Sequence, residues 1–279
     1  AISLGATTVT LTGGGNFASG GMSLNNANSK LLLNSITLDS ASTSSDSLGV
    51  DVDANSTITA LTVSNTTPVS IADGVSLSGG IAATAGSINL DETGTLASTV
   101  TMAGGTLDVD ETATVSGALS HTADITIDVL TDKTLTYSGT AISLGANTIT
   151  LSGGGTFTSG GMILNNANSK LLLNSITLDS ASASAESLGV DVDADSTITA
   201  LTVSNTTPVS IADGVSLSGA ITVPVAAGTI NLDETGTLAS TVTMTKGTLD
   251  VDETSTLSGA LTQSGDITID VLTDKTLTY

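Results

Sequence analysis

The chain has 279 residues, of which 39% are hydrophobic and 1% are aromatic, and its formal net charge is −22. This hydrophobic fraction excludes a wholly disordered chain, while the near absence of aromatic residues argues against an ordinary globular core. Five lysines, no arginine and a strongly negative charge exclude nucleic acid and anionic membrane as favourable partners. We expect no membrane insertion, because no apolar run approaches the ~20 residues of a membrane helix.

The sequence consists of two long copies, residues 1–140 and 141–279. The segment from Asn25 to Ser40 recurs unchanged from Asn165 to Ser180. The offset between the copies is 140 residues up to about residue 220 and 142 afterwards, because the second copy is two residues longer there. We expect two repeat copies that continue one another as a single rod.

Within each copy a shorter repeat of 19–22 residues begins with an apolar–polar–apolar strand. In one such strand, Leu107 and Val109 flank Asp108, so the two apolar side chains share one face. A polar segment follows, and then a second and a third short apolar segment complete the repeat. The second apolar residues of the first strands are Leu11, Leu33, Val52, Ile71, Leu90, Val109, Val129, Leu151, Leu173, Val192, Ile211, Leu232, Val251 and Val271.

One repeat departs from this pattern. After Leu33, the apolar residues Ile36 and Leu38 come early and are followed by a Ser-rich segment. We expect this segment, residues 40–47, to bulge out of the coil.

The pattern predicts an all-β fold, a parallel β-helix (β-solenoid) of about 14 rungs, where a rung is one complete circuit of ~20 residues. The handedness of parallel crossovers favours a right-handed coil. Helix signals are poor because Ser, Thr and Gly are abundant and no 3.6-residue periodicity persists. The alternative is two antiparallel β-sandwich domains, but a sandwich gives no reason to repeat one strand every 19 residues.

The segment from Gly145 to Met162, rich in Gly and Thr, resembles the repeats of bacterial autotransporter passenger domains. The ~19-residue rungs also resemble those of filamentous-haemagglutinin-like surface adhesins. These resemblances cover nearly the whole chain. They imply a secreted, surface-displayed solenoid stalk of a large adhesin, and they imply no catalytic residues.

Acidic turns that follow the first strands are the candidate metal sites. If each turn stacks on the next, Asp91 lies against Asp110 and Glu92 lies against Glu111. Stacked carboxylates repel one another, and a bound cation would relieve this repulsion. Their oxygen atoms suit Ca²⁺, so Ca²⁺ is the cofactor to consider. The alternative is a set of solvated turns screened by salt, and the Gly-Gly-x-Gly-x-Asp motif of calcium-binding β-rolls is absent. The candidate ligands are Asp91, Glu92, Asp110, Glu111, Asp233, Glu234, Asp252 and Glu253.

The chain offers no convincing catalytic residues. His121 is the only histidine, and its counterpart in the second copy is Gln263. Pectin-cleaving enzymes share the β-helix fold but use a basic residue beside Ca²⁺, whereas this chain has no arginine and scattered lysines. We therefore expect no enzyme, and a polysaccharide lyase is a weak alternative.

The sequence thus predicts an extracellular structural β-solenoid, which acts as a stiff stalk or a self-assembling fibre of a surface adhesin. Its expected partners are itself, by end-to-end or lateral association, adjoining repeats of a longer chain, and a host or neighbouring cell surface. A Ca²⁺-binding or glycan-binding surface module is the main alternative, although the scarcity of aromatic residues argues against sugar binding. An ice-binding protein is less favoured, because outward residues such as Thr10, Leu32 and Asp51 form no regular threonine column.

Overall fold

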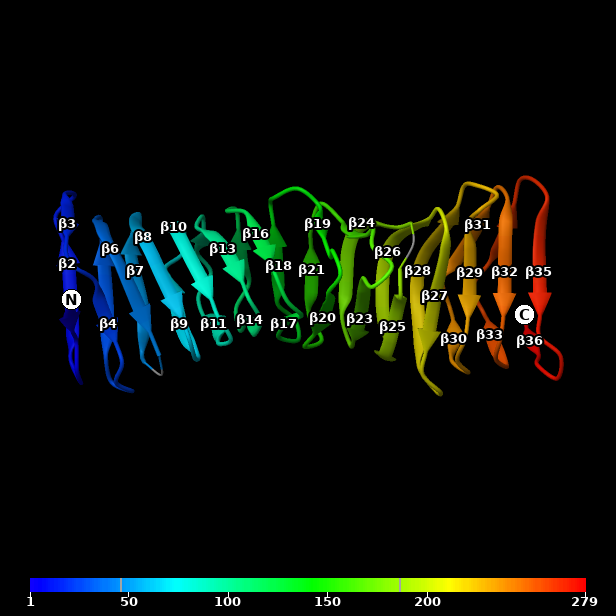
Figure 1. The fold of residues 1–279 in the computed structure, drawn as a ribbon, viewed down its shortest axis with the longest axis horizontal. Helices are drawn as coiled ribbons and strands as arrows, with labels where there is room; N and C mark the ends of the chain where they lie inside the picture. Colours follow the sequence, from blue (N-terminus) through cyan, green and yellow to red (C-terminus); the bar gives the residue numbers. More distant parts are fainter. Residues whose placement is uncertain (46, 186) are drawn as a thin grey trace. The chain divides into compact units, whose positions relative to one another are not determined.

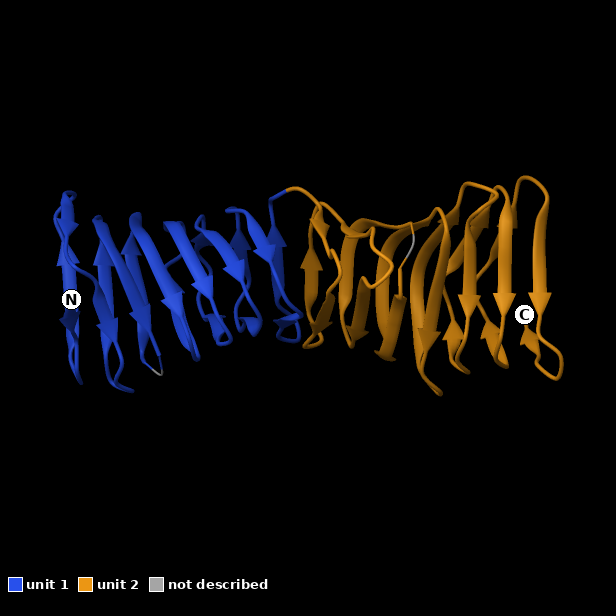
Figure 2. Cartoon of the chain, viewed as in Figure 1, with its two compact units in different colours: residues 1–139 blue, residues 140–279 orange. Residues whose placement is uncertain are grey.

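A computed structural model describes residues 1–45, 47–185 and 187–279, which form 36 β-strands and contain no helix (Figure 1). The chain divides into two compact units, Ala1–Gly139 and Thr140–Tyr279 (Figure 2). No membrane-spanning helix is found in the part of the chain that the structure describes.

Each unit contains two parallel sheets, and every rung crosses both. In unit 1, sheet 1 has one strand from each of seven rungs. These strands are β2 (Thr8–Thr12), β5 (Lys30–Asn34), β7 (Gly49–Ala54), β9 (Thr67–Ile71), β11 (Ser87–Leu90), β14 (Thr106–Val109) and β17 (Ile125–Val129). Sheet 2 consists of β1 (Ile2–Ser3), β3 (Asn16–Ala18), β4 (Met22–Leu24), β6 (Thr37–Ser44), β8 (Ser56–Val63), β10 (Ser76–Ala83), β12 (Thr95–Leu96), β13 (Thr99–Met102), β15 (Ala113–Val115), β16 (Leu119–His121) and β18 (Thr134–Tyr137).

Unit 2 repeats this arrangement. Its sheet 1 consists of β20 (Thr148–Ser152), β23 (Lys170–Asn174), β25 (Gly189–Ala194), β27 (Thr206–Ile211), β29 (Thr229–Leu232), β32 (Gly247–Val251) and β35 (Ile267–Val271). Its sheet 2 consists of β19 (Ile142–Ser143), β21 (Thr156–Thr158), β22 (Met162–Leu164), β24 (Thr177–Ser184), β26 (Ser196–Val203), β28 (Ser216–Val223), β30 (Thr237–Leu238), β31 (Thr241–Met244), β33 (Ser255–Leu257), β34 (Leu261–Gln263) and β36 (Leu277–Thr278).

The predicted β-solenoid is confirmed, with seven rungs in each unit. The paired strands of the described residues run parallel, with partners 19–23 residues apart, as in β11 with β14 and β27 with β29. Parallel pairing excludes the antiparallel sandwich. Alternation places apolar side chains inside: Leu107 and Val109 are fully buried, whereas Asp108 lies on the outer face. The handedness of the coil stays a prediction.

The register differs from the predicted one at a single rung of each unit. The repeat pattern predicts Ile71 opposite Leu90, but Thr67 pairs with Ile88, which places Val69 opposite Leu90. In unit 2, Thr207 pairs with Ile230 in the same way. A shift of two residues keeps each side chain on its own face of the sheet, so the apolar pattern fits both registers.

The prediction that residues 40–47 bulge out is wrong for the part that lies in strand β6, and residue 46 lies outside the described residues. Ser40, Ser42 and Ser44 face the interior and are almost fully buried. Ser44 Oγ lies 2.8 Å from Ser47 Oγ and accepts a hydrogen bond from the buried Thr67 hydroxyl at 2.9 Å. These mutual hydrogen bonds let hydroxyl side chains replace apolar ones inside the coil.

Glycine is required where neighbouring rungs approach closely. Gly49 begins β7 with φ of +83°, and a Cβ atom there would lie 1.9 Å from the backbone oxygen of Pro68 in the next rung. Gly189 and Pro208 repeat this contact at 2.0 Å. No larger residue fits without movement of the backbone, so these two glycines fix the spacing between β7 and β9 and between β25 and β27.

Candidate functional site

The candidate site is the outer surface of sheet 1, where carboxylates from successive rungs come together. We call Asp51, Asp53, Asp91, Glu92, Asp108, Asp110, Glu111 and Asp128 the acidic face of unit 1. Asp108 pairs directly with Asp128 on the next strand, and Asn89 precedes it in the same column. Unit 2 repeats this column as Asn231, Asp250 and Asp270.

The predicted stacking of Asp91 on Asp110 agrees with the register, because Leu90 pairs with Val109 and the Asp110 N–H donates to the Leu90 carbonyl at 3.0 Å. Both carboxylates have partners in the preceding rung. The Ser70 hydroxyl donates to Asp91 Oδ1 at 2.7 Å, and Asn89 Nδ2 donates to Asp110 Oδ2 at 3.0 Å.

Unit 2 holds the corresponding carboxylates in the same way. The Ser210 hydroxyl donates to Asp233 Oδ1 at 2.7 Å, and Asn231 Nδ2 donates to Asp252 Oδ2 at 3.1 Å. The aspartates of all four acidic turns are therefore fixed by neutral hydrogen-bond donors one rung earlier in the chain.

Lysine side chains neutralise part of the acidic face. Lys133 Nζ lies 2.6 Å from Glu111 Oε2, and Lys275 Nζ lies 2.5 Å from Glu253 Oε2. Lys30 likewise pairs with Asp51 at 2.5 Å, and Lys170 pairs with Asp191. The lysines look scattered in the sequence, because a partner about 20 residues away can be recognised only once the register is known.

Burial, together with the like charges that remain, raises the pKa of four carboxyl groups. Burial raises the pKa of Asp108, and the charges of Asp110 and Asp128 raise it further, while the Val109 backbone N–H partly offsets this effect. Burial and then the charges of Asp252 and Asp270 raise the pKa of Asp250 in unit 2.

The pKa of Glu92 is affected by a different group of neighbours. Desolvation and then the charges of Asp51, Asp91 and Asp53 raise its pKa, and Lys30 acts in the opposite direction. The pKa of Glu234 in unit 2 is raised by the equivalent surroundings. The acidic face therefore contains unrelieved electrostatic repulsion at equivalent places in both units.

The structure arranges the predicted calcium ligands in rows rather than in a closed cluster. Within residues 1–45, 47–185 and 187–279, no group of three or more His, Cys, Asp or Glu side chains is placed to hold a metal ion. The buried oxygens Asn89 Oδ1 and Asn231 Oδ1 have no hydrogen-bond partner in that part of the chain. Calcium binding by the eight residues of the acidic turns, and the alternative of solvated turns screened by salt, both stay predictions.

His121 lies at the end of β16, and its Nδ1 atom is 3.2 Å from the carbonyl oxygen of Ala123. Nδ1 therefore donates a hydrogen bond to the backbone.

No protein-family model, curated protein sequence or solved structure matched the chain.

Proposed function

We propose that the chain is a structural segment of a secreted bacterial surface protein, in which the stacked rungs form a stiff spacer. The proposal combines the β-solenoid fold with the sequence resemblance to autotransporter and haemagglutinin-like repeats. Its partners are adjoining repeats or second copies of the chain, and the surface of a host or neighbouring cell. Adhesion is the associated role of the complete protein.

The observation that supports this function best is the unbroken pairing from rung to rung. In unit 1 the column Leu90, Val109 and Val129 continues through three rungs in one register. All three side chains are almost fully buried. A rung in such an array is stabilised by its neighbours on both sides, so the stability of the array increases with every rung added.

The exposed edge of β35 is a place where a partner of such a spacer could bind. This strand pairs with β32 on one side, and Ile269 and Val271 are 47% and 38% exposed. Exposed backbone and apolar side chains at a sheet edge favour the addition of another strand. Further repeats, or a second copy of the chain, would cover these residues.

A deletion of one whole rung tests the modular architecture. Removing residues 91–109 joins Leu90 to Asp110, which preserves the register because Leu90 already pairs with Val109. We expect this variant to unfold cooperatively with a slightly lower Tm, since one interface between rungs is lost. The matched control removes residues 91–100 and joins Leu90 to Thr101, and it should fail to fold because half a rung is missing. Equal damage in both variants would contradict a modular solenoid.

The spacer role is tested on cells that display the chain between a membrane anchor and a terminal peptide tag. We expect a bulky antibody to bind the tag less well as whole rungs are removed, because the tag then lies nearer the cell surface. The level of displayed protein is measured with a small tag-binding probe. Antibody binding that does not change with the number of rungs would overturn the spacer function.

A further inference from the structure

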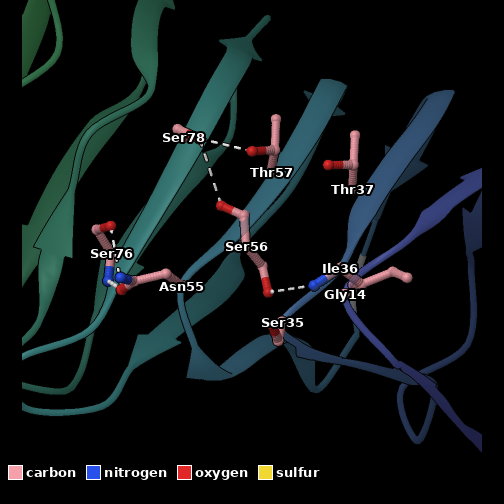
Figure 3. A pocket seen from close by; sticks show the side chains of 9 residues that line it. All are labelled: Gly14, Ser35, Ile36, Thr37, Asn55, Ser56, Thr57, Ser76 and Ser78. Carbon is pink, nitrogen blue, oxygen red and sulfur yellow. Dashed lines mark hydrogen bonds between the residues drawn. The ribbon is translucent and has the colours of Figure 1, made fainter.

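Each unit has a small hollow lined by hydroxyl groups at the edge of sheet 2, where three successive rungs contribute the same positions. Figure 3 shows the hollow in unit 1. The hollow in unit 1 has a volume of about 210 Å³ and that in unit 2 about 190 Å³. In unit 1 the residues Thr37, Thr57 and Ser78 form one column across β6, β8 and β10. The column in unit 2 is Thr177, Thr197 and Ser218.

The floor of each hollow is fixed by hydrogen bonds. The buried Ser56 hydroxyl donates to the Ala54 carbonyl at 2.8 Å and accepts from the Ile36 N–H at 3.3 Å. Above it, the Thr57 and Ser78 hydroxyls lie 2.8 Å apart. In unit 2 the Thr197 and Ser218 hydroxyls lie 2.7 Å apart. The walls are therefore held in one arrangement before any ligand binds.

The Thr37 hydroxyl is the unused member of the column. It forms no hydrogen bond within the described residues, and in Figure 3 its oxygen points along the row in the same direction as that of Thr57. Such a hydroxyl is both a donor and an acceptor for a ligand. Thr177 occupies the equivalent place in unit 2.

The two hollows differ at one position, Asn55 in unit 1 and Asp195 in unit 2. Asn55 Oδ1 accepts from the Ser76 N–H at 2.9 Å and from the Ser76 hydroxyl at 3.3 Å. Asp195 Oδ1 makes the same two contacts with Ser216, at 2.8 and 3.1 Å. The other terminal atom of the side chain therefore differs: Nδ2 of Asn55 is an amide donor in unit 1, and Oδ2 of Asp195 is a charged acceptor in unit 2.

We propose that each hollow binds one neutral hexose unit of a glycan. Sugar hydroxyls match a surface of hydroxyls that donate and accept, and the volume suits one ring rather than a larger ligand. The hollow in unit 1 contains no charged residue, so charge is not required for the shared recognition. The net charge of −22 disfavours acidic sugars.

The affinity of each hollow is low, and the two hollows differ in strength. Hydrogen bonds exchanged with water give a small net gain, and neither hollow contains an aromatic platform. A sugar hydroxyl that donates to the free oxygen of Asp195 forms a charge-assisted bond, which makes the unit 2 hollow roughly fivefold tighter than the unit 1 hollow. This glycan recognition is independent of the spacer role.

The test is a nuclear magnetic resonance titration of the full chain with glucose, galactose and mannose at millimolar concentrations. We expect saturable shifts of the Ile36, Thr37 and Thr57 amide signals, and of their counterparts in unit 2, with at least one hexose. The Asp195→Asn variant should weaken the unit 2 hollow roughly fivefold, and Asn55→Asp should strengthen the unit 1 hollow by the same factor.

A second pair of variants separates binding from folding. Thr37→Val and Thr177→Val remove the unused hydroxyls at nearly constant shape and should abolish the shifts in the altered hollow. The control Thr99→Val changes an exposed threonine in β13 and should leave them intact. The proposal is overturned by no saturable shift with any of the three hexoses, by shifts that survive the valine substitutions, or by a response to Ca²⁺ alone around Asp195.

Discussion

The acidic residues on sheet 1 are placed by the repeat, which brings some carboxylates of neighbouring rungs side by side. Asp108 and Asp128 are direct partners in neighbouring parallel strands, and like charges in such positions are destabilising. The same repeat brings Lys133 to Glu111. A periodic sequence therefore stacks carboxylates that repel one another. Where a lysine takes one place in the repeat, it neutralises a neighbouring carboxylate and reduces this repulsion.

Protonation of these carboxyl groups should stabilise the fold. The pKa values of Asp108, Asp250, Glu92 and Glu234 are raised in the folded state. The folded state then binds protons more tightly than the unfolded state, so their destabilising effect is present at neutral pH and is lost as the pH falls through the raised pKa values. We expect Asp108→Asn to raise the stability at pH 7 by about 0.5 kcal/mol.

The measurement is the Tm of the native chain and of Asp108→Asn between neutral and mildly acidic pH. The difference between the two proteins should shrink as the pH falls, because the native Asp108 then becomes protonated. Asp73→Asn, at an exposed turn, is the control for a simple reduction of net charge. A difference that grows on acidification would contradict the proposed repulsion.

Divalent cations provide a second test of the acidic turns. Lys133 and Lys275 already neutralise Glu111 and Glu253, so we expect Ca²⁺ and Mg²⁺ to raise the Tm equally, by screening alone. Thermal unfolding in EDTA, in Ca²⁺ and in Mg²⁺ measures this. A larger rise with Ca²⁺ that disappears in Asp110→Asn would instead make the acidic turns calcium sites.

At the scale of single elements, the sequence predicted where the strands of sheet 1 lie in the chain more accurately than it predicted the register between them. In β9, either Thr67 and Val69 or Val69 and Ile71 can lie opposite Ile88 and Leu90 of β11. Both alignments keep the same side chains inside, so the hydrophobic pattern does not distinguish a shift of two residues. The buried serines of β6 were missed for a related reason. Their burial depends on mutual hydrogen bonds such as that between Ser44 and Thr67, which composition does not reveal.

The candidate site was predictable to the same extent. The stacking of Asp91 on Asp110 follows from the Asp-Glu-Thr turn that recurs one rung later, at residues 91–93 and 110–112, and the structure has that register. The partners Ser70 and Asn89 could not be predicted, because the contact of Ser70 with Asp91 arises only from the shifted register between β9 and β11. The hydroxyl hollows likewise need three rungs in known alignment before they exist.

Close contact between β7 and β9 can be tested with alanine. Gly49→Ala should destabilise by about 3 kcal/mol or more, since backbone strain of about 1–2 kcal/mol at positive φ adds to a clash with the Pro68 backbone. Gly74→Ala is the matched control, because Gly74 also has positive φ, of +72°, but nothing lies within 4 Å of its added Cβ. Denaturant unfolding measures both variants, and equal losses would show that strain alone explains the glycine at position 49.

For the whole molecule, the large negative net charge is the main electrostatic influence on stability. A net charge of −22 opposes the compact state through self-repulsion, and four lysine ion pairs relieve it only locally. We expect the Tm to rise by several degrees between ~0.01 M and ~0.5 M NaCl, where the screening length falls from about 30 Å to a few ångströms. A Tm that falls with salt would mean that the ion pairs outweigh the repulsion.

The constant pairing distance along the chain also governs how the protein folds. Strand partners are 19–23 residues apart, which in a chain of 279 residues corresponds to a relative contact order of about 0.07, within the range of helical bundles rather than of β-sandwiches. Loop closure therefore costs little entropy at each step. Once one rung has formed, the next can dock on it directly, so the chain can fold progressively as it emerges, without waiting for distant segments.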